Sequence, residues 1–163
     1  MAQFLDPNQM MFTSFEPKLR NRFTLEMDGI PTFLVKKCGR PKATTGTVTM
    51  NHMNVDWKTA GKTKWEPVDV EIYDSIAPSG MQIIMEQMRL HHESVTGRDN
   101  YADVYKKDAT FSVIGPPGDI IEQWTLKGAW ITNFDGGEFD FSTEDEAATI
   151  SFTMEYDYSV MDF

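Results

Sequence analysis

The sequence has 163 residues, of which 40% are hydrophobic and 25% charged, as expected for one globular domain. No apolar run approaches the roughly 20 residues that a membrane helix needs, and the net charge of −10 disfavours stable binding to a phosphate backbone. The N-terminus lacks the basic start and apolar centre of a secretory signal, and the single cysteine, Cys38, cannot form an internal disulfide. We therefore expect synthesis in a reducing cytoplasm.

The first 19 residues combine large apolar side chains with two prolines and show no sustained period. Two interpretations remain open: a frayed terminus, or an arm that docks on a neighbouring molecule through Phe4, Phe12 and Phe15. We treat residues 1–19 as this arm and residues 20–163 as a single β domain.

Alternation of apolar and polar residues predicts strands at 22–28, 32–38, 44–51 and 68–72. Residues 44–51 place threonines on one face and Val48 and Met50 on the other. The small polar side chains of that strand are Thr45, Thr47, Thr49 and Asn51. Residues 52–65 have a glycine and scattered bases, which favours a loop; its lysines are Lys58, Lys62 and Lys64.

One helix is expected. Ser79 and Gln82 have the spacing of a capping box, and Gly97 can terminate the helix. The apolar residues recur at helical intervals at Met81, Ile84, Met85 and Met88. Further apolar residues widen this face beyond one stripe, so we expect the helix to contact more than its own sheet.

The last third of the chain is rich in strands and acids. Residues 98–108 are expected to form a loop, and strands are predicted at 109–113, 120–134, 138–141 and 148–158, with glycine turns between them. About eight strands and one packed α-helix make the fold mainly β, an antiparallel barrel or sandwich. After Lys127 there is no base, and nine acids follow: Asp135, Glu138, Asp140, Glu144, Asp145, Glu146, Glu155, Asp157 and Asp162.

The sequence contains no recognisable catalytic motif. The sequence has no phosphate-binding loop, no dinucleotide fingerprint and no nucleophile elbow. His91 and His92 are adjacent, so their side chains diverge on a helix and do not make a metal pair. Cys38 fits a structural role better than a reactive one. We assign no catalytic, cofactor or metal residue and predict that the protein is not an enzyme.

The order of several short motifs carries a family resemblance. Lys37-Cys38 ends an early strand, Tyr105-Lys106-Lys107 precedes the closing strands, and LKGAW at 126–130 is followed by a glycine turn and FTMEYDY at 152–158. In this order the sequence resembles the tail tube protein of contractile-tailed bacteriophages, a family similar in fold to the Hcp tube of type VI secretion. Ile131 is a departure, since members of that family often have proline there.

The resemblance implies a subunit that forms hexameric rings, stacked into a hollow tube inside a contractile sheath. The implied partners are further copies of the chain and the sheath, baseplate and tail terminator proteins. The tape-measure protein and DNA would pass through the channel without specific binding, and the implied location is the tail of a virion assembled in the host cytoplasm. A non-contractile tail or secretion device is the alternative, followed by a stand-alone β-sandwich that binds carbohydrate through exposed tryptophans.

The resemblance also gives the polar and apolar surfaces expected roles. The residues expected to line the channel are Thr45, Thr47, Thr49, Asn51, Glu138 and Asp140. Those expected between subunits are Phe4, Phe12, Phe15, Lys58, Lys62, Lys64, Met85 and Met88. The lysines of residues 52–65 could pair with the acids of residues 138–146 across stacked rings; each exposed pair contributes about 0–1 kcal/mol.

Overall fold

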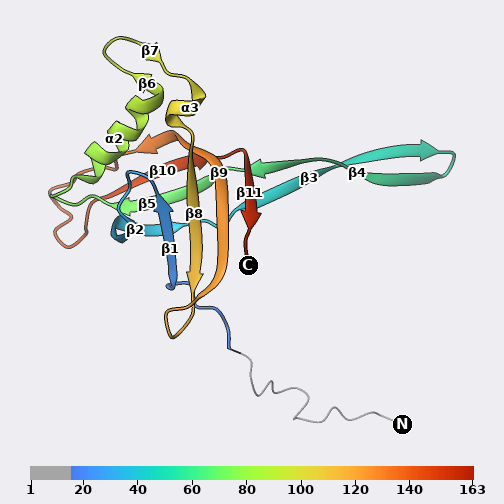
Figure 1. Ribbon diagram of the computed structural model, residues 1–163, viewed down its shortest axis with the longest axis horizontal. Helices are drawn as coiled ribbons and strands as arrows, with labels where there is room; N and C mark the ends of the chain where they lie inside the picture. Colours follow the sequence, from blue (N-terminus) through green and yellow to red (C-terminus); the bar gives the residue numbers. More distant parts are fainter. Residues whose placement is uncertain (1–15) are drawn as a thin grey trace, which may run out of the picture.

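A computed structural model describes residues 16–163, and antiparallel strands dominate it (Figure 1). The largest sheet has seven strands in the order β1-β8-β9-β10-β5-β2, with β11 also paired to β9. Its strands are β1 (Phe23–Met27), β2 (Val35–Cys38), β5 (Val68–Tyr73), β8 (Lys107–Ile114), β9 (Ile120–Asp135), β10 (Thr149–Glu155) and β11 (Tyr158–Met161). The expectation of a mainly β, antiparallel fold is confirmed.

The long strand β9 belongs to both halves of this sheet. Its first half pairs with β8 and β11, and its second half pairs with β10. The register with β8 shifts between Lys107 and Ala109, opposite Gly128, whose φ of 66° is in the region that favours glycine. Figure 1 shows β1 and β8 running across the direction of β5 and β10, so the bent sheet forms two layers.

The core lies between these layers and is filled by alternate residues of each strand. Leu25 and Met27 of β1 are buried, and so are Val68, Val70 and Ile72 of β5. Strand β10 contributes Ile150, Phe152 and Met154 in the same manner. Burial of each such side chain stabilises the fold by about 1.5–3 kcal/mol. The alternation of buried positions confirms that the period-two pattern marks the faces turned towards the core.

The predicted helix forms as α2 (Gly80–His91), and Ile84 is its deepest side chain, with 0% exposure. Ser79 occupies the N-cap position without a side-chain hydrogen bond, so the predicted capping box is wrong. Instead, the backbone N–H of Met81 donates to Asp74 Oδ1 at 3.4 Å. A carboxylate from the preceding segment thus serves the helix N-terminus.

The helix ends at His91, six residues before Gly97, which was expected to terminate it. The chain continues as a small hairpin of β6 (His92–Glu93) and β7 (Arg98–Asp99), in which Gly97 has a φ of 68°. The short helix α3 (Ala102–Tyr105) follows, inside the stretch expected to be a loop, and a 3₁₀ turn, η1 (Thr32–Leu34), precedes β2. His91, Tyr105 and Trp130 meet edge to face with ring centroids 5.6–5.8 Å apart, which joins α2 and α3 to β9.

The remaining strands form a ribbon that extends away from the body, at the right of Figure 1. It consists of β3 (Lys42–His52) and β4 (Val55–Glu66), which pair with one another along almost their full length. The prediction of a loop over residues 52–65 was therefore wrong, because threonines, Val55 and Trp57 favour a strand more than the lysines and Gly61 oppose it. Two other expectations were also wrong: residues 138–141 form no strand, and residues 148–158 divide into β10 and β11.

Candidate assembly surfaces

One face of the β3–β4 ribbon is small and mostly polar. Because directly opposite residues share a face, Thr47 lies beside Ala60, Thr49 beside Lys58 and Asn51 beside Asp56. Nearer the body, the hydroxyls of Thr45 and Thr63 are hydrogen-bonded at 2.9 Å. The structure therefore brings the four predicted channel residues of β3 onto one face, together with one lysine and one aspartate that the sequence pattern did not place there.

The opposite face of the ribbon is apolar towards its tip. Met50 pairs with Trp57, and Val48 and Val55 lie on the same face. The exposed fractions are 49% for Val48, 43% for Met50, 69% for Val55 and 64% for Trp57. An apolar patch this exposed indicates a surface that another molecule covers.

The lysines of β4 do not form one surface. Lys58 shares the threonine face, whereas Lys64 lies opposite Thr44 on the other face. Lys62 lies at the irregularity where the register shifts. These three predicted contact residues therefore point in different directions along the ribbon.

The outer edges of the ribbon carry backbone groups without partners in the part of the chain described here. Within residues 16–163, β3 pairs only with β4, and β4 only with β3. A two-stranded ribbon of this length is marginal in water by itself, and its open edges can accept further strands.

On α2, the two predicted contact residues have different surroundings. Met88 packs against the hydrophobic core, so its side chain is already partly used by the subunit itself. Met85, which is not among the side chains packed against the core, lines a shallow hollow of about 380 Å³ along one side of the helix. Met85 is therefore the better placed of the two for contact with another molecule.

Glu138 and Asp140 lie in the exposed loop between β9 and β10, residues 136–148, called here the acidic loop. Figure 1 shows this loop at the left of the molecule, at the opposite end from the ribbon tip. Asp140 Oδ1 accepts a hydrogen bond from the Ser142 N–H at 2.9 Å, and this bond lowers the pKa of the carboxyl. Beside these acids, Phe139 is 83% exposed and Phe141 fully exposed. The structure thus separates these acids from the threonine face within one subunit.

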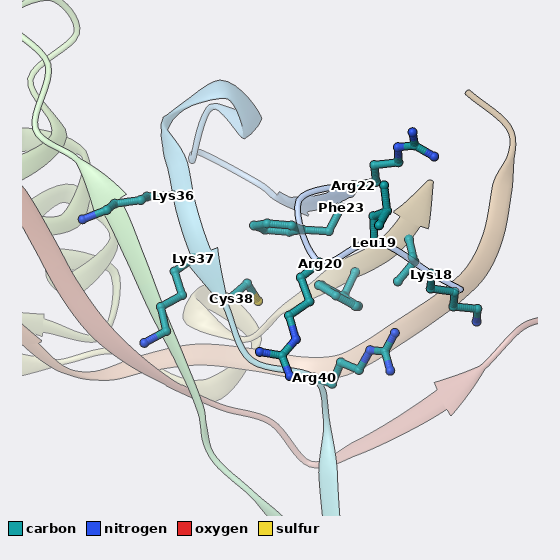
Figure 2. Close-up of a pocket in the computed structure, with 11 residues that line it drawn as sticks. Lys18, Leu19, Arg20, Arg22, Phe23, Lys36, Lys37, Cys38 and Arg40 are labelled. Carbon is teal, nitrogen blue, oxygen red and sulfur yellow. The ribbon is translucent and has the colours of Figure 1, made fainter. Parts of the chain in front are cut away.

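A basic hollow of about 560 Å³ lies between the edge strands β1 and β2 (Figure 2). It is lined by Lys18, Leu19, Arg20, Arg22, Phe23, Lys36, Lys37, Cys38, Arg40, Phe111 and Val113. The hollow was missed in the sequence, although six bases between residues 18 and 40, against only Glu26 and Asp28, are a visible signal. Its bases come from both sides of the gap at which the seven-stranded sheet ends.

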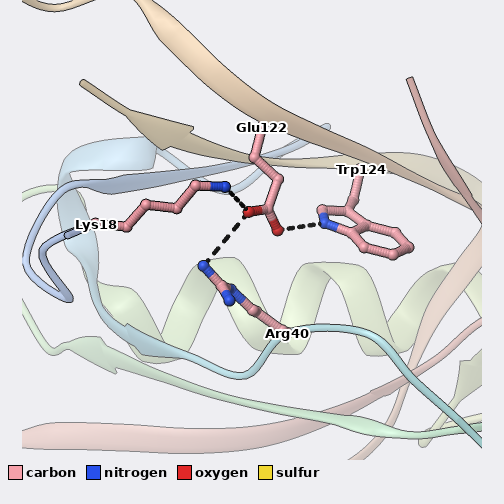
Figure 3. Close-up of polar contacts among 4 residues, drawn as sticks. All are labelled: Lys18, Arg40, Glu122 and Trp124. Carbon is pink, nitrogen blue, oxygen red and sulfur yellow. Dashed lines mark hydrogen bonds and ion pairs between the residues drawn. The ribbon is translucent and has the colours of Figure 1, made fainter. Parts of the chain in front are cut away.

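A buried carboxylate holds one side of this hollow together (Figure 3). Glu122, 5% exposed, accepts hydrogen bonds from Lys18 Nζ at 2.5 Å and Trp124 Nε1 at 2.7 Å, and Arg40 lies at 3.5 Å. Burial by itself would raise the pKa of Glu122, but the hydrogen bonds from Lys18 and Trp124 and the charge of Arg40 outweigh it, and the pKa is lowered. Through its contact with Lys18, Glu122 links the segment before β1 to β9. No sequence motif predicted this role.

Cys38 lies on the floor of the hollow. Its Sγ donates to the Gly39 carbonyl at 3.3 Å, and burial raises the pKa of the thiol to about 12. A thiol that resists ionisation is a poor nucleophile. This environment agrees with a structural cysteine.

Within residues 16–163, no group of three or more His, Cys, Asp and Glu side chains is arranged to hold a metal ion. In the same range, no helix has both the length and the apolar character required to cross a membrane.

Three solved structures show where this fold occurs. The PVC sheath/tube terminator of an extracellular contractile injection system aligns with a TM-score of 0.74 at 15% identity, covering 93% of this chain and 100% of that one. A chain of the PVC sheath-tube complex aligns with a TM-score of 0.71 at 16% identity, covering 98% and 99%. A type six secretion system protein is more distant, with a TM-score of 0.52, 7% identity and coverage of 86% and 82%. At these identities the likeness shows the fold.

The family is shown by the sequence itself. Comparison with curated proteins gave no match. Residues 19–160, however, match the family described as T4-like virus tail tube protein gp19, which confirms the resemblance drawn from the motifs. Because this match spans nearly the whole chain, the protein belongs to the T4-like virus tail tube protein gp19 family and is a tail tube protein of a contractile injection system.

Proposed function

We propose that this chain is a structural subunit without enzymatic activity, and that six copies form a ring which stacks with others into the inner tube of a contractile tail. The observation that carries this proposal is the β3–β4 ribbon, which leaves both edges without partners among the described residues. Ribbons from neighbouring copies can pair edge to edge and close into one barrel, and closure removes every open edge.

Closure also gives each face of the ribbon a distinct environment. The apolar face with Met50 and Trp57 would be covered by the outer layer of the tube wall. Burial of these exposed side chains would stabilise the assembled ring. The threonine face would line the channel. Residues 20–163 would form the tube wall and residues 1–19 the arm that contacts the adjacent ring. Phe4, Phe12 and Phe15 of this arm lie outside the described residues.

A channel of this kind suits the passage of DNA and a tape-measure protein. Hydroxyl and amide groups present no fixed cation to phosphates, and Asp56 lies beside Lys58 near the tip to offset its charge. The net charge of −10 disfavours retention of DNA on the tube as a whole. DNA would therefore move through without specific binding.

The outer partners follow from the contractile relatives. Two of the related structures are a sheath/tube terminator and a chain of a sheath-tube complex. We therefore propose sheath, terminator and baseplate proteins as partners, and a virion tail assembled in the host cytoplasm as the location. A secretion or injection particle is the second candidate, since the same fold occurs in the PVC and type six proteins.

Electron microscopy of the purified protein tests this proposal. We expect rings or tubes with a central hole, and a loss of both in Trp57→Ser, because a small polar side chain replaces the largest side chain of the apolar face, which is 64% exposed. Val95→Ser is the matched control, since Val95 is 93% exposed in the β6–β7 turn. A wild-type protein that stays a monodisperse monomer at all concentrations would contradict the proposal.

A further inference from the structure

We propose that the basic hollow of one copy receives the acidic loop of a second copy, with Phe139 and Phe141 entering the hollow and the neighbouring acids meeting its bases. This contact rests on the proposed self-assembly and names the surfaces that join two subunits. It adds a second contact between subunits to the ribbon pairing, which concerns the inner wall of the tube.

The hollow carries positive charge that the ion pairs of the subunit neutralise only in part. Lys18 and Arg40 are paired with Glu122, and Lys36 turns towards Glu71, whose Oε1 lies at 2.8 Å. Within residues 16–163, no ion pair involves Arg20, Arg22 or Lys37. Three unpaired cations around one hollow are an attractive site for an anionic segment on a chain whose net charge is −10.

The acidic loop has the complementary composition. Residues 136–148 contain five acids and no base. No ion pair to Glu138, Glu144, Asp145 or Glu146 occurs in the described part of the chain. Two phenylalanines alternate with the first acids of the loop, so aromatic and anionic groups are presented together.

The floor of the hollow can accept those aromatic side chains. It contains Phe23 and Phe111, whose rings are stacked with centroids 6.1 Å apart, and Val113 and Cys38 extend the apolar surface. A volume of about 560 Å³ lies within the range typical of ligand pockets. Aromatic anchors in an apolar pocket, rimmed by charged pairs, are the usual energetic centre of an interface.

The occupant must come from another copy. In the single chain, Phe139 and Phe141 are 83% and 107% exposed, so the loop does not fill its own hollow. Contact between two different surfaces of identical chains is head-to-tail, and repetition of such a contact generates a ring or a helical stack. The lysines of the ribbon are a weaker match, because they point in different directions and offer no concave apolar surface.

This contact gives Glu138 and Asp140 a place between subunits, in contrast to the channel expected from the sequence. The threonine face of the ribbon keeps its proposed place in the channel. The two surfaces lie at opposite ends of the subunit, so one copy can use both at once (Figure 1).

A charge-swap experiment tests the contact. The loop variant is Glu138→Lys/Glu144→Lys, which leaves the Asp140 hydrogen bond to Ser142 in place. The hollow variant is Arg20→Glu/Lys37→Glu, which leaves the pairs of Glu122 untouched. The control, Arg98→Glu, reverses a positive charge as the hollow variant does, but on β7, outside the loop and the hollow.

Assembly is measured by sedimentation and electron microscopy at one protein concentration, with circular dichroism to confirm folding. We expect each swapped variant alone to lose at least ten-fold of the assembled fraction, while the control assembles like the wild type. An equal mixture of the two swapped variants should recover assembly, since each loop then meets a hollow of opposite charge in the alternate copy.

The outcomes separate the two proposals. If the wild type assembles and the swapped variants assemble equally well, or if their mixture does not recover, the loop contact is overturned while the tube proposal stands. A loss of assembly in the control as large as in the swapped variants would also overturn the contact, because net charge would then explain it. If the wild type itself does not assemble, the proposed function fails first.

Discussion

Replacing Glu122 by glutamine should destabilise the subunit by about 1–2 kcal/mol at pH 7. Hydrogen bonds to charged groups contribute about 1.5–3 kcal/mol, but the Lys18 side chain is 44% exposed, which reduces its share to about 1 kcal/mol. Arg40, 55% exposed and at 3.5 Å, adds little. Glutamine keeps an acceptor for Trp124, so that bond is weakened and not lost.

The size of this loss should depend on pH. The folded-state pKa of Glu122 is lowered, so its contribution to stability is present above the unfolded value of about 4.3 and is lost as pH falls through the folded value. The difference between wild type and Glu122→Gln should therefore disappear in acid, once the pH is below the lowered folded-state pKa.

The assay is denaturant unfolding followed by tryptophan fluorescence, at equal protein concentrations because assembly stabilises the folded state. Glu26→Gln, at an exposed position of β1, is the control and should stay within about 0.5 kcal/mol of wild type. Full stability of Glu122→Gln at pH 7, or an equal loss at pH 7 and in acid, would refute the role assigned to this carboxylate.

Two further substitutions and one labelling experiment test the fold. Ile84→Ala should cost about 2–5 kcal/mol in the same unfolding assay because Ile84 is fully buried; a loss below about 1 kcal/mol would show that α2 is not anchored there. Gly128→Ala should cost about 1–2 kcal/mol, since the φ of 66° at the bend of β9 disfavours a side chain; a neutral effect would argue against the bend. Cys38 should react with a thiol reagent at pH 8 far more slowly in the folded protein than in denaturant, because burial raises the pKa of its thiol to about 12; equal rates would contradict its burial.

The strands that line the core were predictable because burial on one face leaves a period-two pattern. Leu25 and Met27 of β1, and the alternating residues of β5 and β10, show this clearly. Of the two ribbon strands, β3 was predicted and β4 was not. Both faces of the ribbon are exposed in the single chain, so no buried face marks β4 in the sequence. Its lysines favoured a loop, whereas pairing with β3 decided the structure.

The assembly surfaces were predictable only where residues of one kind share one strand. The threonines of β3 could be assigned to one face by counting alternate positions. The basic hollow combines residues before β1, on β2 and on β8, and the Glu122 cluster joins Lys18 to β9, so both depend on strand order. The predicted capping box was wrong because the helix N-terminus is capped by a residue outside the motif. The Met81 N–H donates to Asp74, seven residues earlier in the chain, and Ser79 makes no side-chain hydrogen bond.

The most direct measurement is a cryo-EM reconstruction of the assembled particle at side-chain resolution. We expect a hollow tube in which β3 and β4 of neighbouring copies pair along the inner wall, with Thr47 and Thr49 facing the channel and Trp57 facing outward. A tube in which Trp57 faces the channel and the threonines face the sheath, or in which the ribbons do not pair with one another, would contradict the proposed function.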